Sequence, residues 1–146
     1  MKDAKELFIF CDGGARGNPG PAAAACVFKD KAGNPRFLCG KYLGITTNNQ
    51  AEYAAVKLAL EVVKEQFHQT KCIKFFLDSK LVANQLAGLY KVKDASLREI
   101  FFQIRELESR LEEVYYQHVS RGENEEADRL VNKAIDQRKD FQQKID

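Results

Sequence analysis

Two aspartates, Asp12 and Asp78, each follow directly on a run of apolar residues, and this pattern restricts the folds that the chain can adopt. The runs at 7–11 and 73–77 are rich in aromatic and β-branched residues, which predicts buried strands. A carboxylate so close to a core is costly to bury, and two together cost more unless a cation compensates. If the two strands are neighbours, both carboxylates lie at one end of one sheet.

The rest of the chain alternates strand and helix patterns around these two strands. Short turns join the first strand to strands at 22–28 and 36–43, which indicates an antiparallel meander. Apolar residues at steps of three and four then predict a helix over 49–67, which leads to the strand at 73–77 by a right-handed crossover. Further periodic segments complete a mixed α/β prediction: a short helix at 80–86, a long helix over 97–111, a strand at 114–119 and a last helix capped by Asn124.

The length and charge of the chain bound its organisation and its partners. With 146 residues, 45% of them hydrophobic, we expect one domain over 1–146 with its core at about 7–137. The 23 basic and 21 acidic residues leave a net charge of +2, which excludes a polybasic mode of attracting nucleic acid or an anionic membrane. Any binding of a polyanion must therefore come from local placement of charge.

Compartment can be argued from the apolar segments and the cysteines. The sequence has no apolar stretch of membrane-spanning length and a start too charged for a secretory signal, so we expect a cytoplasmic protein without a membrane partner. The cysteines stand singly in apolar segments, with no spacing typical of zinc. We expect four buried free thiols, at Cys11, Cys26, Cys39 and Cys72.

Two further carboxylates stand where they could join Asp12 and Asp78: Glu52 in the first turns of its helix, and Asp128 in the first turn of the last helix. Oxygen ligands without Cys or His are typical of sites for Mg²⁺ or Mn²⁺. Structural roles are the alternative for each residue alone, because Asp78 could cap the helix that follows it and the helix dipole favours acids at helix starts. Spacing alone leaves both interpretations open.

Four separated motifs carry a resemblance to a known family. Along the chain they are DGGARGNPGP at 12–21, TNNQAE at 47–52, LDS at 77–79 and NEEAD at 124–128. In this order and spacing they resemble type 1 ribonuclease H, and the similarity runs from about residue 7 to residue 135. The short loop before the last motif resembles that of an archaeal-type subgroup.

The resemblance implies a ribonuclease H-like α/β fold with a five-stranded mixed sheet, in the order 3-2-1-4-5, and helices on both faces. It implies an endoribonuclease that hydrolyses the RNA strand of RNA·DNA hybrids by a two-metal-ion mechanism and leaves 5′-phosphate and 3′-hydroxyl ends. Glu52 would also touch a ribose 2′-hydroxyl, which only RNA carries. Two Mg²⁺ or Mn²⁺ ions would be bound, with substrate present, by Asp12, Glu52, Asp78 and Asp128.

Other matched positions would contact the hybrid. Glycine allows the backbone to approach the RNA strand closely, and amide side chains can serve a minor groove. Asn18 before a proline is also an ordinary turn residue, and Thr47 could instead form a helix capping box with Gln50, so both roles stay open for these two residues. The expected substrate contacts are Gly13, Gly14, Asn18, Thr47, Asn48 and Asn49.

Two departures from the best-known members concern substrate binding and catalysis. The basic helix and loop that grips the DNA strand in many members is absent; Tyr90, Lys91 and Lys93 form either a reduced substitute or a solvated turn. Affinity for the hybrid should then be weak and steeply salt-dependent, and we expect no hybrid-binding domain before the first strand. The place of a mobile catalytic histidine falls to Arg121, which can hold a phosphate or a product, with His118 as the alternative.

Other functions compatible with the same residues are cleavage of double-stranded RNA, exonucleolytic cleavage, and a non-catalytic nucleic-acid-binding module. A carboxylate at every expected position favours the hybrid nuclease. The expected partner is an RNA·DNA hybrid, with double-stranded RNA as a second candidate, and we infer no obligate protein partner.

Overall fold

Strand β1 (Glu6–Ala15) occupies an inner position of the sheet, as its apolar run predicts. The computed structural model describes residues 5–145, and residues 1–4 and 146 lie outside that range. The other elements are β2 (Gly20–Lys29), β3 (Pro35–Thr46), α1 (Asn48–Gln66), β4 (Cys72–Leu77), α2 (Lys80–Leu86), α3 (Ala95–Glu108), β5 (Glu113–His118), the 3-10 turn η1 (Arg121–Asn124), α4 (Glu125–Gln137) and β6 (Phe141–Lys144).

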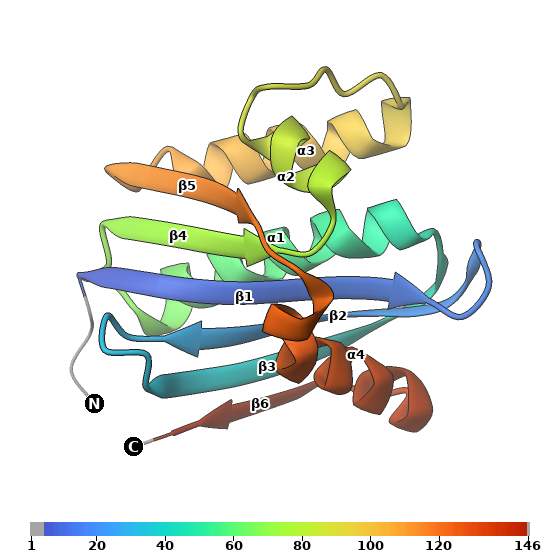
Figure 1. The fold of residues 1–146 in the computed structure, drawn as a ribbon, viewed down its shortest axis with the longest axis horizontal. Helices are drawn as coiled ribbons and strands as arrows, with labels where there is room; N and C mark the ends of the chain where they lie inside the picture. Colours follow the sequence, from blue (N-terminus) through green and yellow to red (C-terminus); the bar gives the residue numbers. More distant parts are fainter. Residues whose placement is uncertain (1–4, 146) are drawn as a thin grey trace.

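The strands form one mixed sheet in the order β5-β4-β1-β2-β3-β6 (Figure 1). β1 pairs antiparallel with β2 on one side and parallel with β4 on the other, so it joins the meander to the crossover half. β3 continues the meander and β5 runs parallel to β4. The predicted α/β fold and the order of the first five strands are confirmed.

The structure adds a sixth strand, β6, which the prediction of five strands and a core ending near 137 did not include. β6 pairs antiparallel with β3 at the sheet edge. Its single apolar residue, Phe141, gives no alternation that could signal a strand. A Cβ on Gly40 would lie 2.5 Å from the Phe141 ring, so the glycine is what lets this ring pack on β3.

Helices cover both faces of the sheet, with α1 and α3 on one face and α4 on the other (Figure 1). On the first face, Leu7 and Ile9 of β1 belong to one buried cluster with Tyr53 of α1. On the second face, Ala23 and other small residues of β2 pack with the apolar stripe of α4. α4 is thereby fixed against the strand next to β1, close to the end where the two aspartates lie.

Helix ends differ from the predicted boundaries by a few residues. The capping box is confirmed, because the Thr47 side chain accepts from the Gln50 N–H and the Gln50 side chain reaches back to the Thr47 backbone. α3 ends at Glu108, three residues before the predicted end, where the Ser109 hydroxyl donates to the Glu106 carbonyl at 2.6 Å. β5 accordingly begins and ends one residue earlier than predicted.

All four cysteines are free thiols, as predicted, and three of them are buried. Cys72 is only half-buried at the start of β4, where the prediction of full burial is wrong. Within residues 5–145, no helix combines the length and apolar character needed to cross a membrane.

Candidate active site

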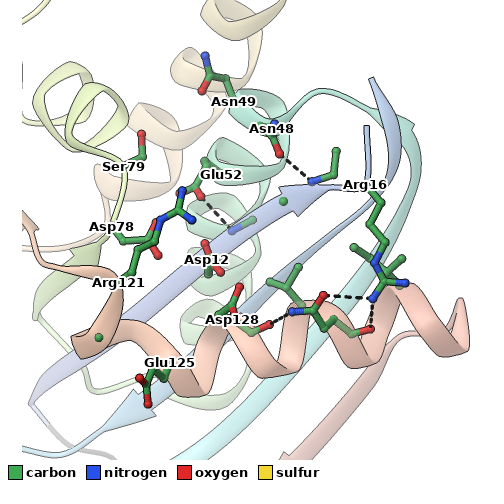
Figure 2. A pocket seen from close by; sticks show the side chains of 17 residues that line it. Asp12, Arg16, Asn48, Asn49, Glu52, Asp78, Ser79, Arg121, Glu125 and Asp128 are labelled. Carbon is green, nitrogen blue, oxygen red and sulfur yellow. Dashed lines mark hydrogen bonds between the residues drawn. The ribbon is translucent and has the colours of Figure 1, made fainter. Parts of the chain in front are cut away.

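Asp12 and Asp78 lie side by side because of the register of the parallel pair β1–β4. Cys11 of β1 is the register partner of Leu77 of β4, and Asp12 and Asp78 come directly after these two paired residues. The two aspartates therefore lie next to each other at the same end of the strand pair. Glu52, in the second turn of α1, adds a third carboxylate. One oxygen from each of these three residues lies within 4.8 Å of the others (Figure 2). The predicted convergence is therefore present for this carboxylate triad, Asp12, Glu52 and Asp78.

A missing side chain lets α1 approach β1 at this point. A Cβ on Gly13 would lie 2.2 Å from the carbonyl carbon of Ala51, closer than atoms can approach. The Gly13 N–H instead donates to Glu52 Oε1 at 3.4 Å, while Glu52 Oε2 is buried without a hydrogen-bond partner among the described residues. Gly13 thus positions Glu52 beside Asp12.

The electrostatics of the triad are unfavourable without a cation. Burial, followed by the charge of Asp78, raises the pKa of Asp12 to about 7. Burial, followed by the charge of Asp12, raises the pKa of Glu52 well above its ordinary value. Both shifts have the same cause, namely carboxylates held together away from water. A bound cation would reverse this repulsion.

The donor set fits a hard divalent ion. It consists of carboxylate oxygens alone, two of the three residues are buried, and Glu52 Oε2 has an unused acceptor position. Mg²⁺ and Mn²⁺ favour such oxygen ligands and keep several waters, which suits a site open on one side. Asp12, Glu52 and Asp78 are thus the residues that could hold such an ion.

The structure shows which residue caps the helix that begins beside Asp78. Ser79, not Asp78, caps α2, because the Ser79 hydroxyl accepts from the Val82 N–H at 3.3 Å. Asp78 is therefore free of the capping role that the sequence left open, and its carboxylate faces Asp12.

Asp128 lies outside the compact triad but lines the same cleft, which measures about 620 Å³. It is exposed in the first turn of α4, and its charge contributes to the raised pKa of Asp12. The four predicted carboxylates thus share one cleft, three in close contact and one on the facing helix (Figure 2).

Asn124 ties these elements together in a way that sequence reasoning missed. Asn124 is the N-cap residue of α4, as predicted, but its side chain makes no capping hydrogen bond there. Its buried amide donates instead to the Cys11 carbonyl at 2.8 Å and to Asp78 Oδ2 at 3.4 Å. The only signal in the sequence was its place in the motif that also contains Asp128.

The expected substrate contacts divide into two groups. Gly13, Gly14, Asn48 and Asn49 line the cleft, but Asn18 and Thr47 do not. Asn18 Oδ1 accepts from the Asn48 N–H at 2.9 Å, and Thr47 caps α1. These two residues therefore hold the β1–β2 loop and the start of α1 in place.

Arg121 and His118, the two candidates for the place of the catalytic histidine, differ in their position relative to the cleft. Arg121 is exposed and lines the cleft near Asp78, whereas His118 is the last residue of β5, paired with Leu77, and is not among the lining residues (Figure 2). The cleft also contains residues that the sequence did not indicate: Ala15, Arg16, Ser79, Gly122, Glu125, Val131, Asn132 and Ile135. Several of them lie at helical spacing from Asp128 along α4, which is the signal that could have found them.

Comparison with known proteins agrees with this geometry. A family model described as "Reverse transcriptase-like" matches residues 10–134. Ribonuclease HI of Halobacterium salinarum is 39% identical over 130 residues, which cover 89% of this chain and 64% of that protein. The chain belongs to the ribonuclease HI family. Among family relatives, Bifunctional protein Rv2228c of Mycobacterium tuberculosis is 36% identical over 133 residues, 90% of this chain.

The present chain covers only part of the length of these two relatives: 64% of the Halobacterium protein and 36% of the mycobacterial one. Among solved ribonuclease H structures, LC11-RNase H1 in complex with an RNA/DNA hybrid matches with a TM-score of 0.85 at 38% identity. The match covers 90% of this chain and 98% of LC11-RNase H1. The ribonuclease H fold is therefore shared over nearly the whole chain.

Proposed function

We propose that the chain is an endoribonuclease that hydrolyses the RNA strand of RNA·DNA hybrids and requires two divalent ions, Mg²⁺ or Mn²⁺. The observation that carries the proposal is the convergence of Asp12, Glu52 and Asp78 within 4.8 Å at the floor of an open cleft. The hybrid bound to LC11-RNase H1, a relative of similar fold, supports the choice of substrate.

Four carboxylates would bind the two ions. Asp12, Glu52 and Asp78 would hold the ions together with Asp128 of α4, and Asp12 would contact both of them. When bound, such a pair of ions supplies an activated water and a Lewis acid at the leaving oxygen. Attack of water on phosphorus and loss of the 3′-oxygen leave a 5′-phosphate on one fragment and a 3′-hydroxyl on the other.

Polar residues on the cleft rim orient the hybrid. Asn48 Oδ1 accepts from the Ala15 N–H at 2.8 Å, which leaves the side-chain NH₂ of Asn48 as a donor toward a base or sugar edge. Arg121 beside Asp78 holds a phosphate or the leaving product, since a guanidinium cannot act as a general base at neutral pH. Glu52 would contact the 2′-hydroxyl, which only RNA carries.

Weak binding follows from the short connection between α2 and α3. Tyr90, Lys91 and Lys93 are exposed there and offer only two cations to the DNA strand. With few phosphates neutralised, affinity should fall steeply with salt. Reduced cysteine thiols fit action in a reducing, cytoplasmic compartment.

The test is cleavage of an end-labelled RNA·DNA hybrid with Mg²⁺ or Mn²⁺, beside RNA and DNA duplexes of the same sequence. Internal cuts confined to RNA in the hybrid, lost in Asp12→Asn and Asp78→Asn, are expected. Glu99→Gln, an exposed carboxylate on α3, is the matched control and should keep full activity. Absence of cleavage with either metal would contradict the proposal and leave a binding module; terminal cuts only would indicate an exonuclease.

A further inference from the structure

Arg16 is a cation of the cleft that no role described so far uses. It follows the last residue of β1, the strand that carries Asp12, and lines the cleft wall. Its Nη1 lies 2.5 Å from Asp136 Oδ1, and its Nη2 donates to Asn132 Oδ1 at 3.1 Å. Two residues of α4 therefore hold the guanidinium in one place.

Stability alone does not account for this arrangement. The Arg16 and Asp136 side chains are 47% and 62% exposed, and ion pairs so exposed contribute only about 0–1 kcal/mol. α4 is already anchored by buried residues such as Ala127, Val131 and Ala134 against β2. The main effect of the contacts is to fix the orientation of a half-exposed guanidinium, which has five N–H donors.

The distribution of charge around the cleft indicates a binding role for the Arg16 cation. Five carboxylates line the cleft, and among the described lining residues the cations are Arg16 and Arg121. The two arginines lie on opposite sides of Asp12 (Figure 2). The backbone of Arg16 is four residues beyond Asp12, about 13 Å along an extended strand, and its contacts with α4 hold the guanidinium away from the carboxylate triad (Figure 2).

We propose that Arg16 binds a backbone phosphate of the hybrid at a subsite displaced from the cleavage point, on the side away from Arg121. This inference rests on the proposed function. Guanidinium and phosphate pair through two parallel hydrogen bonds, and Asn132 and Asp136 present the guanidinium already oriented for them. A fixed donor loses less side-chain entropy on binding than a free one.

The rival explanation is a structural tie between β1 and α4. Asn132 contacts Arg16 and also donates from Nδ2 to the Asp128 carbonyl at 3.1 Å, so the tie could position Asp128. The two explanations predict different kinetics when the ion pair is broken by changing Asp136 instead of Arg16. Asp136→Asn removes the pair but keeps the cation, whereas Arg16→Gln removes the cation and keeps a hydrogen-bonding side chain.

The experiment measures kcat, KM and the salt dependence of kcat/KM on a hybrid for the full chain and these variants. For Arg16→Gln we expect KM to rise about tenfold with kcat within about twofold, and the slope of log(kcat/KM) against log[salt] to fall by about 0.9, one phosphate contact. Arg16→Lys should keep the slope and recover part of KM. Asp136→Asn should not raise KM, and thermal midpoints of all variants should agree within a few degrees.

Equal rises of KM in Arg16→Gln and Asp136→Asn, or an unchanged salt slope in Arg16→Gln, would overturn the subsite in favour of the structural tie. If the parent chain cuts hybrids and Arg16→Gln is indistinguishable from it, the subsite alone is refuted. If the parent cuts no hybrid with Mg²⁺ or Mn²⁺, the proposed function fails and the subsite fails with it.

Discussion

Gly13 of β1 and Ala51 of α1 are in backbone contact, and a Cβ on Gly13 would lie 2.2 Å from the Ala51 carbonyl carbon. Gly13→Ala must therefore push α1 away from β1 and move Glu52 with it. We expect a loss of roughly 1–3 kcal/mol in unfolding free energy and at least about a hundredfold loss of hybrid cleavage. Urea unfolding and the cleavage assay measure both effects.

Gly14→Ala is the matched stability control for this prediction. Its Cβ would meet only Val131 Cγ1, at an ordinary 3.8 Å, so stability should change by less than about 0.5 kcal/mol. Equal destabilisation by the two substitutions would contradict the packing role of Gly13.

The buried carboxyls predict an unusual pH dependence of stability in the absence of divalent ions. The pKa of Asp12 is raised to about 7 in the folded chain from an ordinary value of 3.8, so the folded state binds more protons than the unfolded state between these values. Stability should therefore fall as pH rises from about 4 to 7. Asp12→Asn should flatten this slope and raise stability at pH 8 by at least about 1 kcal/mol, or roughly 3 °C.

The measurement is thermal unfolding in EDTA at several pH values, with Glu99→Gln as the control that keeps the parent slope. A parent whose stability rises steadily over pH 4–7 would show that the carboxyls are not held together as described.

Divalent ions should stabilise the folded chain through the triad. An ion at about a hundred times its Kd adds about 2.7 kcal/mol, which for this length is a rise of roughly 5–10 °C in thermal midpoint. The rise should vanish in Asp12→Asn and persist in Glu99→Gln. NaCl at equal ionic strength gives the baseline, and an unchanged midpoint with both Mg²⁺ and Mn²⁺ would argue against a metal site.

Asn124→Ala should affect both folding and catalysis. The substitution leaves the buried Cys11 carbonyl without its 2.8 Å donor and removes the amide beside Asp78. We expect a loss of about 1–3 kcal/mol and at least about a tenfold fall in kcat, with a smaller change in KM. A purely structural role would be indicated by normal kcat at a temperature where the variant is fully folded.

Gly40 and Phe141 should be energetically coupled across the β3–β6 edge. Gly40→Ala places a methyl group 2.5 Å from the Phe141 ring, so the ring must leave its position. Phe141→Ala removes the obstacle, and the double variant should be more stable than the sum of the two single losses predicts, by about 1 kcal/mol. Hybrid cleavage should be normal, because neither residue lines the cleft. Strict additivity would mean that the ring does not pack on Gly40.

Much of the site could be predicted from sequence because Asp12 and Asp78 each follow directly on an apolar run, although β1 continues past Asp12 to Ala15. That signal is local, and the parallel register then places both residues at one edge. The role of Gly13 could not be found in this way, since its contact, Ala51, lies 38 residues further along the chain (51 − 13 = 38) and the steric conflict exists only after α1 has docked. A glycine motif indicates that space is needed but does not identify what occupies it.

Asn124, Arg16 and β6 were missed for related reasons. An asparagine before a helix is typical of a side-chain cap, and only the packing of η1 against β1 brings its amide to the Cys11 carbonyl. The partner of Arg16 depends on how α4 lies across β2, which no periodicity specifies. β6 consists of one aromatic and three polar residues, and Gly40 on another strand accounts for its docking.

The inner position of β1 also has a consequence for when the carboxylate cluster can form during folding. Asp12 meets Asp78 only after residues 72–77 have paired with β1, and Asp128 joins only once α4 has docked on β2. Pairing between strands so distant in sequence forms slowly compared with local structure. The complete carboxylate cluster therefore exists only in a chain that has been made through α4 and has folded, so the capacity to bind divalent ions at this cleft is a property of the whole fold and of no shorter segment.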